Sequence, residues 1–372
     1  VLGNGRGGQL KIGESRAWKM ASGRRLYPTV ELPGFARNIT FSPDDKWIVP
    51  QFVYGPDPAS QILDVETLTE VRAFRSPANA IGSQFSPDGK RLAVACRDGQ
   101  IRIWDVASGE LRVTMMAGES VHWMEFAMQG KLMAARTFAG KIIVFDVKSG
   151  YALHKLDDLG AIQSDVNESS PWLAVGNRAG DSFLVNMESG ELTKLSPGSD
   201  APVQQIQLNE DGTRVLSVVF TGQPRVWDTN TRELLFETPE AGFYSAGIFH
   251  PNGRVVALIA SPHNDLKWGK VELWDIDKKT QLSEPLISGG QTTQGRMNFS
   301  HNGRMLAVGN ARGDLSVWEY PTGTKLLKIS LGGAERFRVN SVEFSHDDTR
   351  LAVYGFHSGT LTGRLTMIDL PP

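Results

Sequence analysis

Short apolar runs alternate with turn-forming residues along this chain of 372 residues. The clearest unit is 85–109, FSPDGKRLAVACRDGQIRIWDVASG, in which 92–96 and 101–106 are apolar or β-branched runs typical of strands. The segments 86–89 and 97–99 carry the Pro, Asp and Gly residues that favour tight turns. Because one such unit leaves its sheet faces exposed to water, the pattern predicts a fold built from stacked copies.

The end of the third strand of this unit recurs along the chain and marks each copy. Nine copies are visible, at Ser15–Met20, Ser60–Val65, Ile101–Val106, Ile142–Val147, Ser182–Met187, Pro224–Thr229, Val271–Ile276, Leu315–Tyr320 and Leu365–Leu370. They recur roughly every 40 to 50 residues, a period that indicates four strands per unit. Trp104, Trp227, Trp274 and Trp318 repeat on the same strand, so we expect them to pack between neighbouring sheets.

The FSPDG…IRIWD pattern resembles the WD-repeat family of β-propellers over nearly the whole chain. The resemblance implies four-stranded antiparallel blades, with strands a to d numbered from the central channel outward and the Trp-Asp pair at the end of strand c. The Gly-His pair that the family places before strand a is absent, and Asp98 alone stands for the family's turn acid. We therefore expect apolar packing to provide most of the rigidity. Copies as worn as these look more like prokaryotic members of the family.

The count of copies predicts an all-β propeller of eight blades. Strand d at Arg25–Glu31 should pair with the last three strands, Asn340–Leu370, and so close the ring. Seven blades remain possible if the worn unit 161–190 lies outside the ring. Residues 1–24 form either an extra partial repeat or the tail of a preceding propeller or domain, and 25–372 form the propeller.

Composition excludes several classes of partner. The formal net charge is -2 and 22% of the residues are charged, with both signs interspersed, so the basic stripe of a nucleic-acid surface is absent. No apolar run is long enough to span a membrane. Cys96 is the only cysteine and lies in an apolar run, which indicates a buried thiol. These features favour a monomeric propeller in the cytoplasm that binds neither nucleic acid nor membrane.

No sequence motif for catalysis, a metal or a cofactor is present: the chain lacks zinc-ligand, nucleophile-elbow and phosphate-loop patterns. We therefore expect no cofactor and no enzymatic activity. His250, His301 and His346 fall in or beside the a–b turns of successive blades. We expect these turns to hold the three side chains well apart, so that they share no metal site.

The connections between repeats are enlarged in a few blades. Three b–c connections are long, at Tyr54–Ser60, Ser261–Lys270 and Gly355–Gly363, as are the d–a connections Ser288–Gln294 and Gly332–Val339. They belong to blades one, six and eight and their neighbours, and should cluster on one sector of one face. Aromatic and Arg side chains on loops held by a rigid scaffold are typical of interaction sites, whereas neutral loop growth is the alternative. The predicted partner-binding residues are Tyr54, Asp57, His263, Asp265, Trp268, Arg296, Arg336, Phe337, Arg338, Phe356 and His357.

The resemblance implies a non-enzymatic scaffold that presents a rigid face to a protein partner, as a module of a larger bacterial protein. The alternative is a propeller enzyme or small-ligand binder with a site at the mouth of the central channel. Such a site needs several converging polar side chains. The inner strands offer few of them, and we expect His122 and Glu125 to be isolated.

Overall fold

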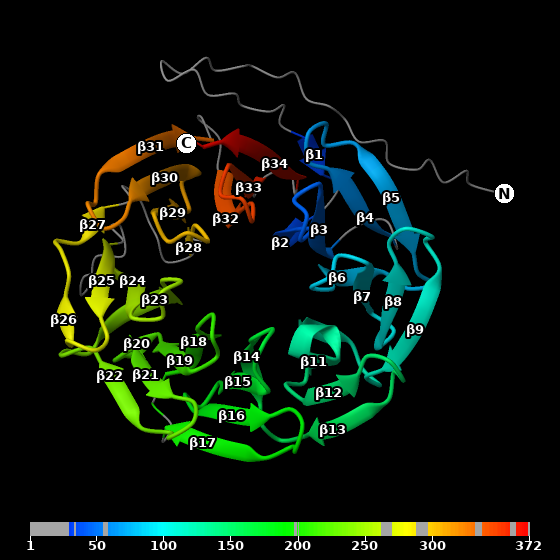
Figure 1. Ribbon diagram of the computed structural model, residues 1–372, viewed down its shortest axis with the longest axis horizontal. Coiled ribbons are helices and arrows are strands. Elements are labelled where there is room, and N and C mark those ends of the chain that lie inside the picture. The colour runs from blue at the N-terminus through cyan, green and yellow to red at the C-terminus, as the bar shows by residue number, and fades with distance from the viewer. Residues whose placement is uncertain are drawn as a thin grey trace.

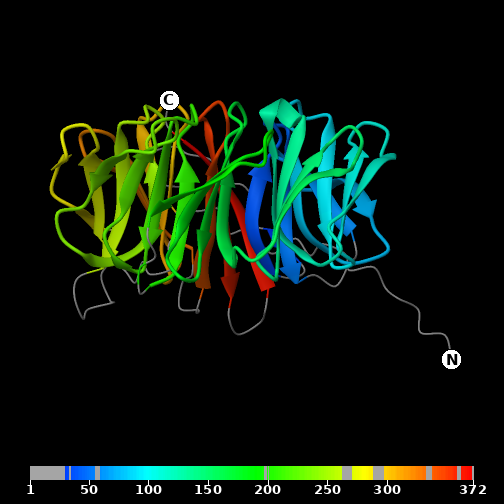
Figure 2. The ribbon, with the colours of Figure 1, turned by 90° about the horizontal axis from the view of Figure 1, so that it is seen from below.

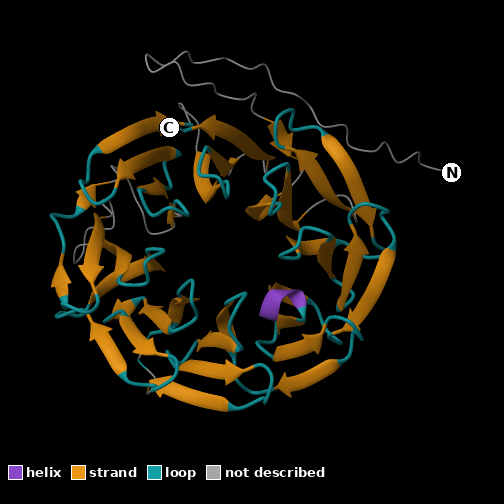
Figure 3. Cartoon of the chain, in the orientation of Figure 1, coloured by secondary structure: helices purple, strands orange, loops and turns teal. Residues whose placement is uncertain are grey.

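The computed structural model describes residues 30–32, 35–54, 59–196, 199, 201–261, 270–287, 297–331, 337–357 and 362–370. Eight antiparallel sheets stand around a common axis like the blades of a propeller (Figure 1). Among the described residues the elements are strands, apart from one short 3-10 helix, η1 (Met128–Gly130), shown in purple in Figure 3. The predicted all-β propeller is confirmed.

The first four blades each contain four strands, with strand a nearest the axis. Blade one is β2 (Phe35–Phe41), β3 (Trp47–Tyr54), β4 (Ala59–Asp64) and β5 (Glu70–Arg75). Blade two is β6 (Ala80–Phe85), β7 (Arg91–Cys96), β8 (Gln100–Asp105) and β9 (Leu111–Met116). Blade three is β10 (Val121–Ala127), β11 (Leu132–Thr137), β12 (Ile142–Asp146) and β13 (Ala152–Leu156). Blade four is β14 (Ala161–Val166), β15 (Trp172–Asn177), β16 (Ser182–Asn186) and β17 (Leu192–Ser196).

The last four blades are less regular. Blade five is β18 (Val203–Leu208), β19 (Arg214–Val219), β21 (Arg225–Asp228) and β22 (Leu234–Glu237). Blade six is β23 (Gly242–Phe249), β24 (Val255–Ser261) and β25 (Lys270–Asp275), with β26 (Thr280–Gln281) and β27 (Leu286–Ile287) as a broken outer strand and β20 (Thr221–Gly222) added beside β23. Blade seven is β28 (Met297–Phe299), β29 (Met305–Gly309), β30 (Asp314–Glu319) and β31 (Lys325–Ser330). Blade eight contains β32 (Phe337–Phe344), β33 (Arg350–His357) and β34 (Thr362–Asp369).

The ring closes in blade eight, where the first and the last of the described strands pair. Strand β1 (Val30–Leu32) pairs antiparallel with β34, with Val30 opposite Leu365 and Leu32 opposite Gly363. Eightfold closure is thereby confirmed, and the seven-blade alternative is wrong because 161–190 forms blade four inside the ring. Residues 1–29 lie outside the described residues, so the partial repeat at 1–24 stays a prediction.

The two faces of the ring carry different connections. Viewed from the side, the a–b turns, including η1 between β10 and β11, lie on the upper face of Figure 2. The b–c connections lie on the lower face, because antiparallel strands reverse direction at each turn. The strand ends that flank the predicted interaction loops, such as Tyr54 of β3 and His357 of β33, therefore approach the lower face.

Apolar side chains fill the seam between each pair of neighbouring blades. The buried apolar residues form eight clusters, and each cluster joins two adjacent blades. At the first seam the rings of Phe74 and Trp104 lie 5.8 Å apart. Trp227, Trp274 and Trp318 lie in or against the clusters of three other seams. The prediction that these Trp residues pack between sheets is confirmed.

Polar bonds supplement the apolar packing along the innermost strands. The Oε1 atom of Gln84 accepts a hydrogen bond from the Phe126 backbone N–H at 3.0 Å, which links blade two to blade three. The carboxylate of Asp165 accepts one from the Leu208 N–H at 2.7 Å, and Gln207 makes the equivalent bond to blade six. An innermost strand has a sheet partner on one side only. Its backbone N–H groups that point away from that partner therefore need acceptors such as these. These bonds occupy positions that the sequence alone did not identify.

The a–b turns of blades seven, eight and one are joined by Asp side chains. The carboxylate of Asp348 accepts bonds from the backbone N–H groups of His301 and Asn302, and that of Asp45 accepts one from the His346 N–H at 2.9 Å. Asp45 and Asp348 adopt φ of 56° and 57°, at a turn position where blades two, five, six and seven use Gly. The imidazoles of His301 and His346 stack with centroids 5.1 Å apart. The expectation that the turns hold the histidines apart is wrong for this pair, because each turn reaches over to the next blade.

Candidate functional site

Blades eight and one form a continuous sector of the lower face. Ile39 of β2 lies in the same apolar cluster as Tyr354 of β33, so the two blades are direct neighbours. Blade seven stands between blades six and eight (Figure 1). The connections 55–58, 262–269 and 358–361 themselves lie outside the described residues. The described part of the sector therefore consists of the strand ends of blades eight and one. Blade six is separated from it by blade seven.

Five of the predicted partner-binding residues are placed by the structure. Strand pairing sets Phe337 opposite His357 and Arg338 opposite Phe356, at the ends of β32 and β33 that approach the lower face. Arg338 is exposed and Phe356 is half-buried. Tyr54 is the last residue of β3 in the neighbouring blade. The fold thus brings two aromatic residues, one Arg and one His together on one strand pair.

The remaining predicted residues lie outside the described residues, and their roles stay predictions: Asp57, His263, Asp265, Trp268, Arg296 and Arg336. The described part of blade eight differs from a regular blade in strand length. Its three strands contain eight residues each, whereas β6, β7 and β8 of blade two contain six. The additional residues extend the sheet at its lower end, where the predicted interaction residues are placed.

Among the described residues, a β-bulge occurs at the same place in seven of the eight innermost strands, and the sequence analysis missed it. The extra residues are Arg37, Ile81, His122, Ile162, Gln204, Ser245 and Asn340. A bulge re-aims its side chain and increases the local twist. The ring of bulges therefore determines which side chains border the axis near the lower face.

The bulges have a sequence signal that could have been read. In β18 the buried residues are Val203, Ile206 and Leu208, which are spaced by three and then by two. A regular strand with one buried face spaces such residues by two throughout. A single spacing of three within an otherwise alternating strand marks the extra residue.

Two carboxyl groups approach one another on the innermost strands of blades three and four. Burial, together with the nearby charges of Asp165 and Glu168, raises the pKa of Glu125 well above its ordinary value. Burial raises the pKa of Asp165 to about 7, and in blade eight it raises the pKa of Glu343 to about 7. The expectation that Glu125 is isolated is wrong, because neighbouring strands a meet across the seam. These groups hold protons at a pH where ordinary carboxyl groups are ionised.

His122 is not isolated either. Its Nδ1 atom accepts a hydrogen bond from Nη2 of Arg136 at 3.0 Å, and its ring meets that of Phe138 edge to face at 4.8 Å. Arg136 is 2% exposed, although it carries a guanidinium. A buried guanidinium needs hydrogen-bond acceptors, so the bond from Arg136 fixes the orientation of the His122 imidazole. The group belongs to the wall between blades three and four, since Arg136 also donates to Ser164.

The described residues offer little catalytic chemistry. They contain no group of three or more His, Cys, Asp or Glu side chains placed to hold a metal ion. Cys96 is buried, and burial raises the pKa of its thiol, which disfavours the reactive thiolate. Within the same part of the chain, no helix has the length and apolar character needed to cross a membrane.

Comparison with known proteins supports the propeller and its repeats. The family model for the anaphase-promoting complex subunit 4 WD40 domain matches residues 77–129. A WD repeat-containing protein 91 homolog of Dictyostelium discoideum is 20% identical over 266 residues, which cover 66% of this chain and 33% of the relative. Autophagy-related protein 16 of Arabidopsis thaliana is 22% identical over 281 residues, which cover 72% of this chain and 53% of the relative. The chain thus spans between a third and about half of the length of these relatives.

A solved structure resembles the whole ring. The C-terminal WD40 domain of Sif2 superposes with a TM-score of 0.73 at 15% sequence identity, covering 93% of this chain and 99% of that domain. The two relatives named above are eukaryotic, so they lend no support to the expected prokaryotic character of the repeats. The recurring Trp-Asp strands, the eight-bladed ring and these matches together identify the chain as a WD-repeat β-propeller.

Proposed function

We propose that this propeller is a non-enzymatic scaffold that presents the lower face of blades eight and one to a protein partner. The observation that supports it is the strand pair β32–β33, where Phe337, Arg338, Phe356 and His357 meet at the end of an extended sheet. Aromatic and Arg side chains carry most of the binding energy in protein interfaces. The closed ring holds these strands in place, so little conformational entropy is lost on binding.

We further propose the setting in which the scaffold acts. It is a monomeric propeller, a module of a larger bacterial protein in the cytoplasm, and it binds neither nucleic acid nor membrane. The near-neutral charge balance supports the exclusion of nucleic acid. The matched family model is named after a subunit of a multiprotein complex, which supports a protein as the partner.

One observation favours the alternative of a small-molecule site near the axis. Burial, together with the nearby charge of Asp165, raises the pKa of Glu125, as happens in paired catalytic carboxyl groups. However, Asp165 accepts the Leu208 N–H and Glu125 accepts the Val166 N–H, so both carboxyl groups bind the backbone of the next blade. We therefore assign them to the seams and retain the scaffold as the proposed function.

The experiment is partner capture with the intact propeller, followed by identification of the captured protein. Combined alanine changes at Phe337, Arg338 and Phe356, which all lie on the β32–β33 pair of blade eight, should abolish capture. Tyr151→Ala is the matched control, because Tyr151 is 77% exposed beside the outer strand of blade three, away from the proposed sector. If the triple variant captures the partner as well as the Tyr151→Ala variant does, the sector is not the binding site.

A further inference from the structure

Two blades carry the same Arg-x-Trp-Asp sequence on strand c. In blade two it is Arg102-Ile103-Trp104-Asp105, and in blade five it is 225–228, Arg-Val-Trp-Asp. Strand pairing places Arg102 opposite Val94 of strand b, and Arg225 opposite Ser217 of strand b. The two Arg residues therefore occupy equivalent places in the repeat, which makes each the internal reference for the other.

In blade two both terminal nitrogens of the guanidinium are paired within the same blade. Nη2 of Arg102 lies 2.7 Å from Oδ2 of Asp98, and Nη1 lies 3.3 Å from Oδ1. Nη2 also donates to the side chain of Gln100 at 2.8 Å. Asp98 stands in the short b–c turn, so the repeat supplies a carboxylate for its own Arg.

In blade five the b–c connection supplies no carboxylate. Its residues 220–224 are Phe-Thr-Gly-Gln-Pro. Instead of turning tightly, it leaves the blade, and β20 pairs with β23 of blade six, with Thr221 opposite Phe243. Arg225 binds Glu237 of the outer strand through Nε alone, at 3.1 Å. Its two terminal nitrogens make no hydrogen bond to any of the described residues.

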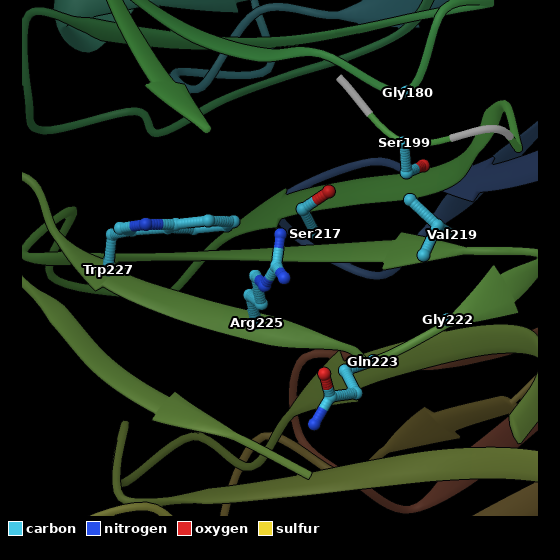
Figure 4. Close-up of a pocket in the computed structure, with 8 residues that line it drawn as sticks. All are labelled: Gly180, Ser199, Ser217, Val219, Gly222, Gln223, Arg225 and Trp227. Carbon is cyan, nitrogen blue, oxygen red and sulfur yellow. The ribbon is translucent and has the colours of Figure 1, made fainter. Parts of the chain in front are cut away.

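The space beside these nitrogens is a cavity of about 110 Å³ between blades four and five (Figure 4). The Arg225 side chain rises between Trp227 and Ser217, and Val219 and Ser199 line the far side. The Arg225 side chain is 34% exposed, so the cavity is open to solvent. It combines a guanidinium and hydroxyl groups with an apolar wall.

The hydroxyl of Ser217 is a second hydrogen-bond donor for a ligand in this cavity. Its oxygen accepts a hydrogen bond from Ser182 of blade four at 2.8 Å, so its own proton is left to donate. Ser217 is itself buried. A carboxylate in the cavity would thus meet two terminal guanidinium nitrogens and a hydroxyl donor, the fork geometry that favours carboxylates.

We propose that this cavity receives the carboxylate of an Asp or Glu side chain of a protein partner, in the place that Asp98 takes in blade two. The proposal rests on the proposed scaffold function and adds a second contact to it. Glu237 already places one negative charge against Arg225, so a singly charged carboxylate suits the site better than a doubly charged phosphate. The methylene groups of the incoming side chain would lie on Trp227 and Val219.

The test uses capped amino acids and needs no partner. N-acetyl-glutamate N-methylamide is titrated into the isotopically labelled propeller, and the indole N–H resonance of Trp227, assigned with Trp227→Phe, is followed. We expect a saturable shift, and binding about tenfold weaker for the N-acetyl-glutamine analogue, which loses the charge-assisted bonds. Arg225→Gln should abolish the shift and Ser217→Ala should weaken it. Arg112→Gln, which changes an exposed Arg of blade two, should leave it intact.

Three results would overturn the proposal. They are equal binding of the glutamate and glutamine probes, an unchanged shift in both the Arg225→Gln and Ser217→Ala variants, and tighter binding of inorganic phosphate than of the glutamate probe. Two variants are used because a folding defect in one would leave the other informative. The outcome is independent of partner capture by blades eight and one, so failure of either proposal can be recognised without the other.

Discussion

Asp165 provides a direct test of how the innermost strands are joined. Its carboxyl group lies at the seam between blades four and five, where burial raises its pKa from 3.8 to about 7. The unfolded chain ionises near the ordinary value, whereas the folded chain keeps the proton until about pH 7. Folding therefore becomes less favourable as the pH rises from about 4 to about 7, because the unfolded state releases its proton first. Above that range the full cost of burying the ionised group remains.

The magnitude follows from the size of the pKa shift. A difference of this size corresponds to at most about 4 kcal/mol. Asp165 is only half-buried, so water near the axis screens part of it, and we expect about 2 kcal/mol. Asp165→Asn removes the ionisation but keeps an oxygen that can accept the Leu208 N–H. The variant should therefore be more stable than the wild type at pH 8, with a gain that shrinks toward pH 4.

Urea unfolding of both proteins between pH 4 and pH 8 measures this difference. Asp88→Asn is the control with the opposite sign. Partial burial acts to raise the pKa of Asp88, but hydrogen bonds from the Ser86 hydroxyl and the Lys90 N–H outweigh it, so the pKa of Asp88 is lowered. Its substitution should cost stability at pH 8 and less at acidic pH. A gain for Asp165→Asn that does not vary with pH, or a loss at pH 8, would refute the account of the seam.

Three further predictions concern the ring and its thiol. Asp45→Gly and Asp45→Ala both remove the bonds to His346, but Ala cannot adopt φ of 56° cheaply, so the Ala variant should unfold about 1 kcal/mol more easily in urea than the Gly variant. Gly247→Ala places a Cβ within 2.8 Å of the Leu258 and Val218 side chains and should lower the free energy of unfolding by about 1–3 kcal/mol. Gly82→Ala is the control, because nothing lies within 4 Å of its Cβ and it should cause no such loss. Equal losses of stability in the two variants would contradict the packing between the blades. Cys96 is fully buried and its pKa is raised by burial, so a thiol reagent should modify it only as fast as the protein unfolds; rapid labelling of folded protein would show otherwise.

Most of the ring could be predicted because its determinants are local. The Pro, Asp and Gly residues at 86–89 specify a tight turn without help from distant residues, and alternating apolar runs specify strands. Counting these units predicted eight blades and the closure that β1 and β34 provide. The Trp residues of strand c were placed correctly for the same reason, since a strand's period determines which side chains face a neighbour.

The contacts between blades could not be read in this way. Glu125 and Asp165 lie 40 residues apart in the chain, as the numbering shows, and become neighbours only when two innermost strands meet. The stacking of His301 on His346 likewise depends on how one turn lies over the next. For the candidate site on blades eight and one, composition indicated the residues, and strand register decided which of them face one another.

Arg102 and Arg225 show most clearly which properties follow from the sequence and which from the tertiary structure. The sequence by itself determined that both occupy the same place in a repeat, because the Arg-x-Trp-Asp pattern and its period are properties of the chain. Only the tertiary structure decided that one guanidinium is paired by its own turn and that the other faces a cavity. The reason is physical: a side chain's partners depend on the path of neighbouring strands, and β20 leaves blade five to join blade six.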